Sequence, residues 1–96
     1  MSILRKYEIM VLLNEEFNAN AVKSWAFNYA QNLKKLNISN ISVTSHGKKR
    51  LAYQIKEKKA AHYLQLNFAT IPKHVNKFSN TLKLDSNVTR FSIFNY

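Results

Sequence analysis

The first apolar stretch of the chain, residues 6–13, predicts a central β-strand. Every position except Glu8 and the flanking Lys6 is apolar, on both faces of an extended chain. That pattern is typical of a strand with one face in the core and the other partly covered. The residues expected to face the core are Tyr7, Ile9, Val11 and Leu13. Those on the opposite face are Glu8, Met10 and Leu12.

Residues 20–36 carry apolar side chains at steps of three and four, which predicts an amphipathic helix. Asn18 or Asn20 is suited to cap its N-terminus, and Asn37 can adopt the left-handed conformation after its last turn. The apolar stripe is expected to pack into the core, Trp25 and Tyr29 included. Its members are Val22, Trp25, Ala26, Tyr29, Ala30, Leu33 and Leu36.

The next stretch, residues 40–55, reads as one long strand interrupted at Gly47, the only glycine in the chain. A glycine at that place fits a bulge or a sharp twist. Three cations follow it, and then apolar and other residues alternate. The alternation predicts that Leu51, Tyr53 and Ile55 return to the core, and that Arg50 and Gln54 lie on the other face of the sheet.

The remainder of the chain predicts a hairpin, a helix and a last strand. A charged hairpin loop is expected at 56–60 and a strand at 61–69, with Leu64, Leu66 and Phe68 on one face. A second helix is expected to open at Pro72 and to end at 85–87. The final strand, 88–94, is expected to turn Phe91 and Ile93 inward. Arg90, Ser92 and Phe94 then face outward.

The order of these elements predicts an α+β fold of the ferredoxin-like type. In this β-α-β-β-α-β arrangement, two helices cover one face of a four-stranded antiparallel sheet. We expect residues 1–96 to form a single domain. The other face of the sheet would be open, and its mixture of apolar, aromatic and cationic side chains would suit docking.

The charge of the chain changes the picture from a generic small domain to one that attracts polyanions. Fifteen Lys and Arg against five Asp and Glu give a net charge of +10 and a sequence pI near 10.0. Nucleic acid, acidic protein and anionic lipid are the partners that such a field attracts. No apolar run approaches the ~20 residues of a membrane span, so no membrane partner is expected.

Catalytic and metal-binding patterns are missing from the sequence. The chain has no cysteine, and His46, His62 and His74 are not spaced as metal ligands. One glycine cannot make a phosphate-binding loop, and the adjacent Glu15 and Glu16 suit a solvated loop better than acid–base work. We therefore expect no enzymatic activity, no metal, no cofactor and no small-molecule substrate. A free-standing basic adaptor that binds RNA or protein is one function that fits these observations.

Several motifs, in order along nearly the whole chain, resemble one family. They are Lys6-Tyr7-Glu8-Ile9, Gly47-x-x-Arg50-Leu51-Ala52-Tyr53-x-Ile55, Ala61-His62-Tyr63 and Asn87-Val88-x-Arg90-Phe91. The chain is similar to the sixth protein of the bacterial-type small ribosomal subunit. Gln54 departs from the pattern, since the family commonly has proline there. Members with long C-terminal tails also extend beyond the position of Tyr96, so the contacts of such a tail are not expected here.

The resemblance implies a structural constituent of the small subunit. Its partners would be ribosomal RNA of the central domain, on the platform, and the eighteenth small-subunit protein. Phosphate neutralisation would drive the RNA contact. The residues expected to bind RNA are Lys48, Lys49, Arg50, Arg5, Lys6 and Arg90. Those expected to contact the partner protein are Met10, Leu12, Tyr63 and Phe94.

The location is expected to be a plastid (chloroplast) ribosome, with the bacterial cytoplasm as the alternative. Asn and Lys are unusually common, which fits an A+T-rich, organellar genome. The N-terminus enters a strand pattern at once and resembles neither a signal peptide nor a transit segment, which suggests a plastid-encoded protein.

Overall fold

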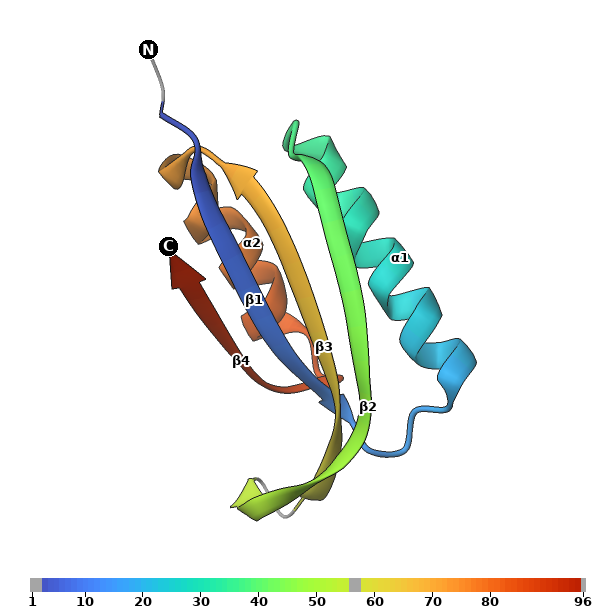
Figure 1. The fold of residues 1–96 in the computed structure, drawn as a ribbon. Helices are drawn as coiled ribbons and strands as arrows, with labels where there is room; N and C mark the ends of the chain where they lie inside the picture. The colour runs from blue at the N-terminus through green and yellow to red at the C-terminus, as the bar shows by residue number, and fades with distance from the viewer. Residues whose placement is uncertain (1–2, 56–57, 96) are drawn as a thin grey trace.

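The elements follow one another in the predicted β-α-β-β-α-β order, with one short 3₁₀ turn before the second helix (Figure 1). The structure, a computed structural model, describes residues 3–55 and 58–95, and within them the side chains of all but Ser39, Gln54 and Ile55. The elements are β1 (Arg5–Asn14), α1 (Ala19–Lys35), β2 (Ser39–Ile55), β3 (Lys58–Thr70), the 3₁₀ turn (Pro72–His74), α2 (Val75–Leu84) and β4 (Val88–Asn95).

The four strands form one antiparallel sheet in the order β2-β3-β1-β4. Both helices lie on the same side of it, as Figure 1 shows. The ferredoxin-like prediction is therefore confirmed. We call the side that carries α1 and α2 the covered face and the opposite side the open face.

The core lies between the covered face and the helices. Ile9, Val11 and Leu13 are fully buried there, and Phe78 and Leu82 of α2 pack against the same cluster. Burying each such side chain contributes about 1.5–3 kcal/mol relative to leaving it exposed. The predicted core face of β1 is confirmed, because alternation along a strand places every second side chain under the helices.

The ends of α1 are formed by asparagines, as expected. Asn18 is the N-cap, and its side chain accepts a hydrogen bond from the Ala21 backbone N–H at 2.8 Å. Asn37 follows the last turn with a φ of 63°, the left-handed conformation.

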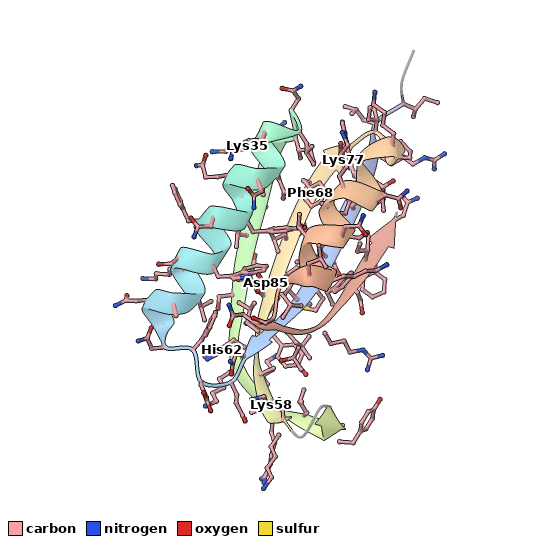
Figure 2. All side chains as sticks on the ribbon, turned by 180° about the vertical axis from the view of Figure 1, so that it is seen from behind. Lys35, Lys58, His62, Phe68, Lys77 and Asp85 are labelled. Carbon is pink, nitrogen blue, oxygen red and sulfur yellow. The ribbon has the colours of Figure 1, made fainter. Side chains whose placement is uncertain are left out.

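The aromatic pair on α1 belongs to the core region, as predicted. The rings of Trp25 and Tyr29 stack with centroids 5.1 Å apart, and Tyr29 is buried. The Trp25 indole N–H donates to Asp85 Oδ2 at 2.7 Å, which fastens α1 to the residue that follows α2. His62 has a comparable structural role, since its Nε2 donates to the Phe17 carbonyl oxygen at 2.6 Å and holds the β1–α1 loop against β3 (Figure 2).

The hairpin formed by β2 and β3 is longer than predicted. β3 begins at Lys58, so residues 58–60 belong to the strand and not to a loop. Residues 56 and 57 lie outside the described part of the chain. β2 and β3 thus run past the end of β1, whose last residue, Asn14, pairs with Ala61. No helix in the described residues is long and apolar enough to cross a membrane.

Candidate nucleic-acid and protein interface

A β-bulge at His46 sets the geometry of the candidate site. Ser45 pairs with Leu64, and Gly47 pairs with Tyr63, the next residue along β3 in the antiparallel direction. His46 is therefore the extra residue on β2. Gly47 has a φ of 83°, a conformation that L-residues with a side chain rarely adopt. The predicted bulge is confirmed.

The bulge exchanges the two faces of β2 at this point. One inserted residue shifts the two-residue side-chain period by one, so odd-numbered residues, which face the helices before the bulge, face the open side after it. Gly47 shares the open face with Tyr63, and Lys49 follows on that face. The register shifts again after Arg50, but Leu51 and Tyr53 line a groove together with the open-face residues Leu12 and Tyr63. The prediction that this segment returns to the core was therefore wrong. The fraction of Tyr53 that is exposed, 70%, agrees. The side chain of Ile55 is outside the described set.

The end of the hairpin curls over the open face and makes a groove there. The groove, of about 210 Å³, is lined by Leu12, Leu51, Ala52, Tyr53, Tyr63 and Arg90. Leu12 is only 8% exposed, although it lies on the face without helices. Lys49 places its ammonium 5.6 Å from the centre of the Tyr63 ring, within the range of a cation–π interaction. The groove thus combines an apolar floor with cations at its rim.

The three consecutive cations of β2 lie on two sides of the hairpin. Lys49 belongs to the open face, while Lys48 and Arg50 pair with His62 and Ala60 and so lie on the opposite side. The expectation that Arg50 lies on the open face was wrong, again because the bulge reverses the period. All three side chains are exposed. A polyanion can therefore meet positive charge from either side of the hairpin.

The four residues predicted to contact a protein partner all lie on the open face. Leu12 stands between Tyr63 and Arg90 in the pairing register, Met10 between Gln65 and Ser92, and Glu8 between Asn67 and Phe94. Phe94 is 52% exposed. Met10, Leu12 and Tyr63 are thus neighbours, and Phe94 lies one row further along the sheet.

A line of polar side chains crosses the open face beside this apolar group. His46 Nε2 donates to Gln65 Oε1 at 2.7 Å, and Gln65 Nε2 donates to Glu8 Oε1 at 3.1 Å. The oxygen and the nitrogen of the Gln65 side-chain amide are both used, so its orientation is fixed, and Glu8 has a neutral partner. This line is not apparent from the sequence, because it depends on which residues of three strands stand side by side.

The predicted RNA-binding residues do not form a single patch. Arg5 pairs with Thr70 and Lys6 with Ala69, whereas Lys49 pairs with Ala61 near the other end of β3. Ala61 and Ala69 are eight positions apart on β3, a distance of about 26 Å. Arg90 borders the groove at the hairpin end. Lys48, Lys49, Arg50 and Arg90 therefore belong to one end, and Arg5 and Lys6 to the other.

The arrangement of the described residues offers a surface for binding. In residues 3–55 and 58–95, no three His, Asp or Glu side chains gather where they could hold a metal ion. The groove at the hairpin is an open, shallow feature of the sheet. What the site supplies is exposed positive charge next to apolar surface.

Comparison with known proteins identifies the family. The family model described as ribosomal protein S6 matches residues 6–95. The chain belongs to the ribosomal protein S6 family. It is 57% identical to the small ribosomal subunit protein bS6c of Phaeodactylum tricornutum over 95 residues, which span 99% of this chain and 97% of the relative. It is 54% identical to bS6c of Trieres chinensis, with 99% of each chain covered.

Solved structures of lower sequence identity share the fold. The crystal structure of 30S ribosomal protein S6 from Thermotoga maritima superposes with a TM-score of 0.88 at 16% identity, and covers 98% of this chain and 89% of that one. The GlnK–ATP complex of B. subtilis reaches a TM-score of 0.56 at 11% identity, with 96% of this chain and 82% of that one covered. At such identities the likeness concerns the fold alone.

Membership of the ribosomal protein S6 family confirms three predictions. The resemblance stated from the motifs was correct. The prediction that the chain is not an enzyme is confirmed, because its relatives are ribosomal proteins. The plastid location is confirmed over the bacterial alternative, because relatives at 57% and 54% identity have the plastid-type name bS6c.

Proposed function

We propose that this chain is a structural constituent of the small subunit of the plastid ribosome. In this proposal it binds ribosomal RNA of the central domain together with the eighteenth small-subunit protein. Family membership supports the ribosomal context. The single observation that carries the binding mode is the bent basic hairpin next to an uncovered sheet face.

The RNA contact is assigned to the hairpin end, with Arg5 and Lys6 as further contacts at the other end. Lys48, Lys49 and Arg50 are exposed on both sides of β2, and Arg90 borders the same groove. Positive side chains displayed in several directions suit the backbone of a folded RNA junction, because phosphates line both sides of its grooves. We expect recognition of shape and charge rather than of base sequence.

The protein contact is assigned to the apolar part of the open face. Met10, Leu12 and Tyr63 are neighbours there, and Phe94 lies one row further along. Leu51 and Tyr53 line the groove on the same surface. Apolar and aromatic groups at the centre of a surface with a polar rim are typical of a protein-binding site. The groove would receive a side chain of the eighteenth small-subunit protein.

Sedimentation with small ribosomal subunits in moderate salt tests the ribosomal assignment. We expect the protein to sediment with the subunits. The subunits used in this experiment lack their own copy of the protein. If the added protein then stays in the supernatant, the assignment is contradicted and a non-ribosomal adaptor is favoured.

Two variants separate the RNA contact from the protein contact. Replacing Lys48 and Lys49 by Ala should reduce the slope of log RNA affinity against log salt by the amount expected for about two phosphate contacts. Phe94→Ala should weaken binding of the partner protein and leave RNA affinity in its absence unchanged. The assignment of faces is wrong if Phe94→Ala weakens RNA binding alone.

A further inference from the structure

A cleft between the two helices is used by neither assigned contact. It has a volume of about 240 Å³, and its floor consists of the buried side chains of Tyr29, Leu33 and Phe78. Lys35 of α1 and Lys77 of α2 stand on opposite sides of its mouth, with Phe68 of β3 behind them in the view of Figure 2. The surface of the cleft is mostly apolar, and its uncharged polar lining residues are Asn32 and Thr81. An apolar cleft between two cations suits a flat apolar group that carries negative charge next to it.

The surrounding end of the molecule is strongly basic. Arg5 pairs with Thr70, and Ser39 pairs with Ala69. The start of β1, the end of α1 and the start of the second helical region therefore lie at the same end of the sheet. The cations there, which we call the upper basic cluster, are Arg5, Lys34, Lys35, Lys73 and Lys77. All five are exposed.

Described acidic residues lie away from this cluster. Glu8 faces the open side of the sheet, where it accepts a hydrogen bond from Gln65. Glu15 and Glu16 follow the far end of β1, and Asp85 follows the last turn of α2, where it binds Trp25. The charge of the upper basic cluster is therefore not neutralised by acidic side chains within the described residues, which leaves it accessible to an external anion.

We propose that this end of the molecule is a second RNA-binding surface, in which the upper basic cluster contacts phosphates and the cleft receives one unpaired base. The proposal rests on the proposed function, because it assumes that ribosomal RNA is the ligand. An apolar protein cavity of about 150 Å³ is large enough for benzene, so 240 Å³ admits a single base ring. Unpaired bases in loops and bulges are the parts of RNA that proteins hold in this way.

Two separate RNA surfaces would make the protein a bridge. The hairpin end and the upper basic cluster are about 26 Å apart along β3. Binding at one end raises the effective concentration of RNA at the other, provided that one RNA spans both. Loss of either end should therefore weaken binding without abolishing it.

The lysines at the cleft can be tested through the salt dependence of RNA binding. The probe is a transcript of the central domain of a plastid small-subunit ribosomal RNA. Replacing Lys35 and Lys77 by Gln should reduce the slope of log affinity against log salt by about 1.5, the amount expected for two phosphate contacts. The matched control is Lys83→Gln, which removes an exposed lysine from the last turn of α2, outside the cleft. An unchanged slope in the double variant would overturn the proposal.

The cleft itself can be tested by filling it. Asn32→Phe places a ring at the mouth, and Gln31→Phe adds the same ring at an exposed neighbour on α1 that does not line the cleft. Asn32→Phe should lower RNA affinity about tenfold with an unchanged salt slope, since stacking of one base is worth about 1–3 kcal/mol. Equal affinities for the two variants, with both folded by circular dichroism, would refute the base-binding role.

The design separates failure of this inference from failure of the proposed function. If the unmodified protein does not bind the transcript, the ribosomal RNA assignment fails. If it binds and only the hairpin variant Lys48→Ala/Lys49→Ala changes the salt slope, the second surface fails alone. A loss of partner-protein binding in the Lys35/Lys77 variant, with RNA binding intact, would assign the cleft to protein and overturn the inference.

Discussion

The two faces of the sheet differ in what covers them and in the residues they carry. The covered face is lined by apolar and aromatic side chains, whereas the open face places apolar side chains beside polar and charged ones. On the covered face, Ile9, Val11 and Leu13 lie beneath the helices and are fully buried. On the open face, Met10 and Phe94 are apolar as well, but they remain partly or largely exposed because no helix packs on them. The comparison shows that an apolar side chain contributes to stability or to binding according to the layer that it faces.

Two phenylalanines provide the sharpest test of this difference. Phe78 is 1% exposed and Phe94 is 52% exposed. Phe78→Ala should lower the free energy of unfolding by about 3–5 kcal/mol, because it leaves a cavity in the core. Phe94→Ala should lower it by less than about 1 kcal/mol. Urea unfolding measures the free energy of unfolding of both variants. Equal losses of stability would contradict the division into a stabilising face and a binding face.

Tyr29 extends the comparison to pH. Burial raises the pKa of its hydroxyl from 10.0 to about 12. A pKa that is higher in the folded state gives stability that is complete below pH 10 and is lost as the pH rises from 10 through 12. Two pKa units correspond to about 2.7 kcal/mol. Unfolding measured across this range should show that loss in the unmodified protein.

Tyr29→Phe should remove this part of the alkaline loss. At neutral pH the variant should lose no more than about 1 kcal/mol, the value of one hydrogen bond. The Phe78 carbonyl oxygen that accepts from Tyr29 also accepts from the Thr81 hydroxyl, so it keeps a partner. Tyr53→Phe is the control, because Tyr53 is exposed on the open face. If both variants change the pH profile alike, burial of Tyr29 is not the cause.

Gly47 tests the point at which β2 exchanges its faces. Apart from Gly47 and its two chain neighbours, no heavy atom of the described residues lies within 4 Å of a Cβ placed there, so the cost of a side chain is that of the positive φ alone. Gly47→Ala should lower the free energy of unfolding by about 1 kcal/mol, and Gly47→Asn by less, since Asn tolerates the left-handed region better. Thermal unfolding of the two variants gives the order of their stabilities. An Ala variant as stable as the original protein would argue against the bulge.

The smallest effect on stability is expected at Tyr53. Tyr53→Ala should change the free energy of unfolding by less than about 0.5 kcal/mol, because the ring is largely exposed. It should nevertheless weaken binding of the eighteenth small-subunit protein about tenfold, since aromatic residues dominate such interfaces. Val43→Ala, an exposed position on the same strand before the bulge, is the control in the same binding assay. Equal affinities for the two variants would remove Tyr53 from the interface.

Local patterns predicted those parts of the molecule whose structure depends on neighbours in sequence. The alternation of β1 identified the buried face, and Asn18 and Asn37 marked the ends of α1. The motifs around Gly47 also identified the family. Such features follow from the two-residue period of strands and from hydrogen bonds within one turn of a helix.

The line from His46 through Gln65 to Glu8 could not be predicted in this way. These side chains come from three strands, and their hydrogen bonds require the register of β2 on β3 and of β3 on β1. The cleft between α1 and α2 is a similar case, since its lysines are 42 residues apart in sequence. Strand order and helix placement are properties of the whole fold.

By itself, the sequence determined the elements, the buried face of β1, the position of the bulge and the family. Only the tertiary structure decided that Leu51 and Tyr53 face the open side, because after a bulge the alternation along the strand no longer tells which face a residue is on. Only the tertiary structure decided that Arg5 and Lys6 lie at the end opposite Lys48 and Lys49. The physical reason is the same for both results: positive charge and apolar character belong to single residues, whereas the surface they form depends on how the strands pair.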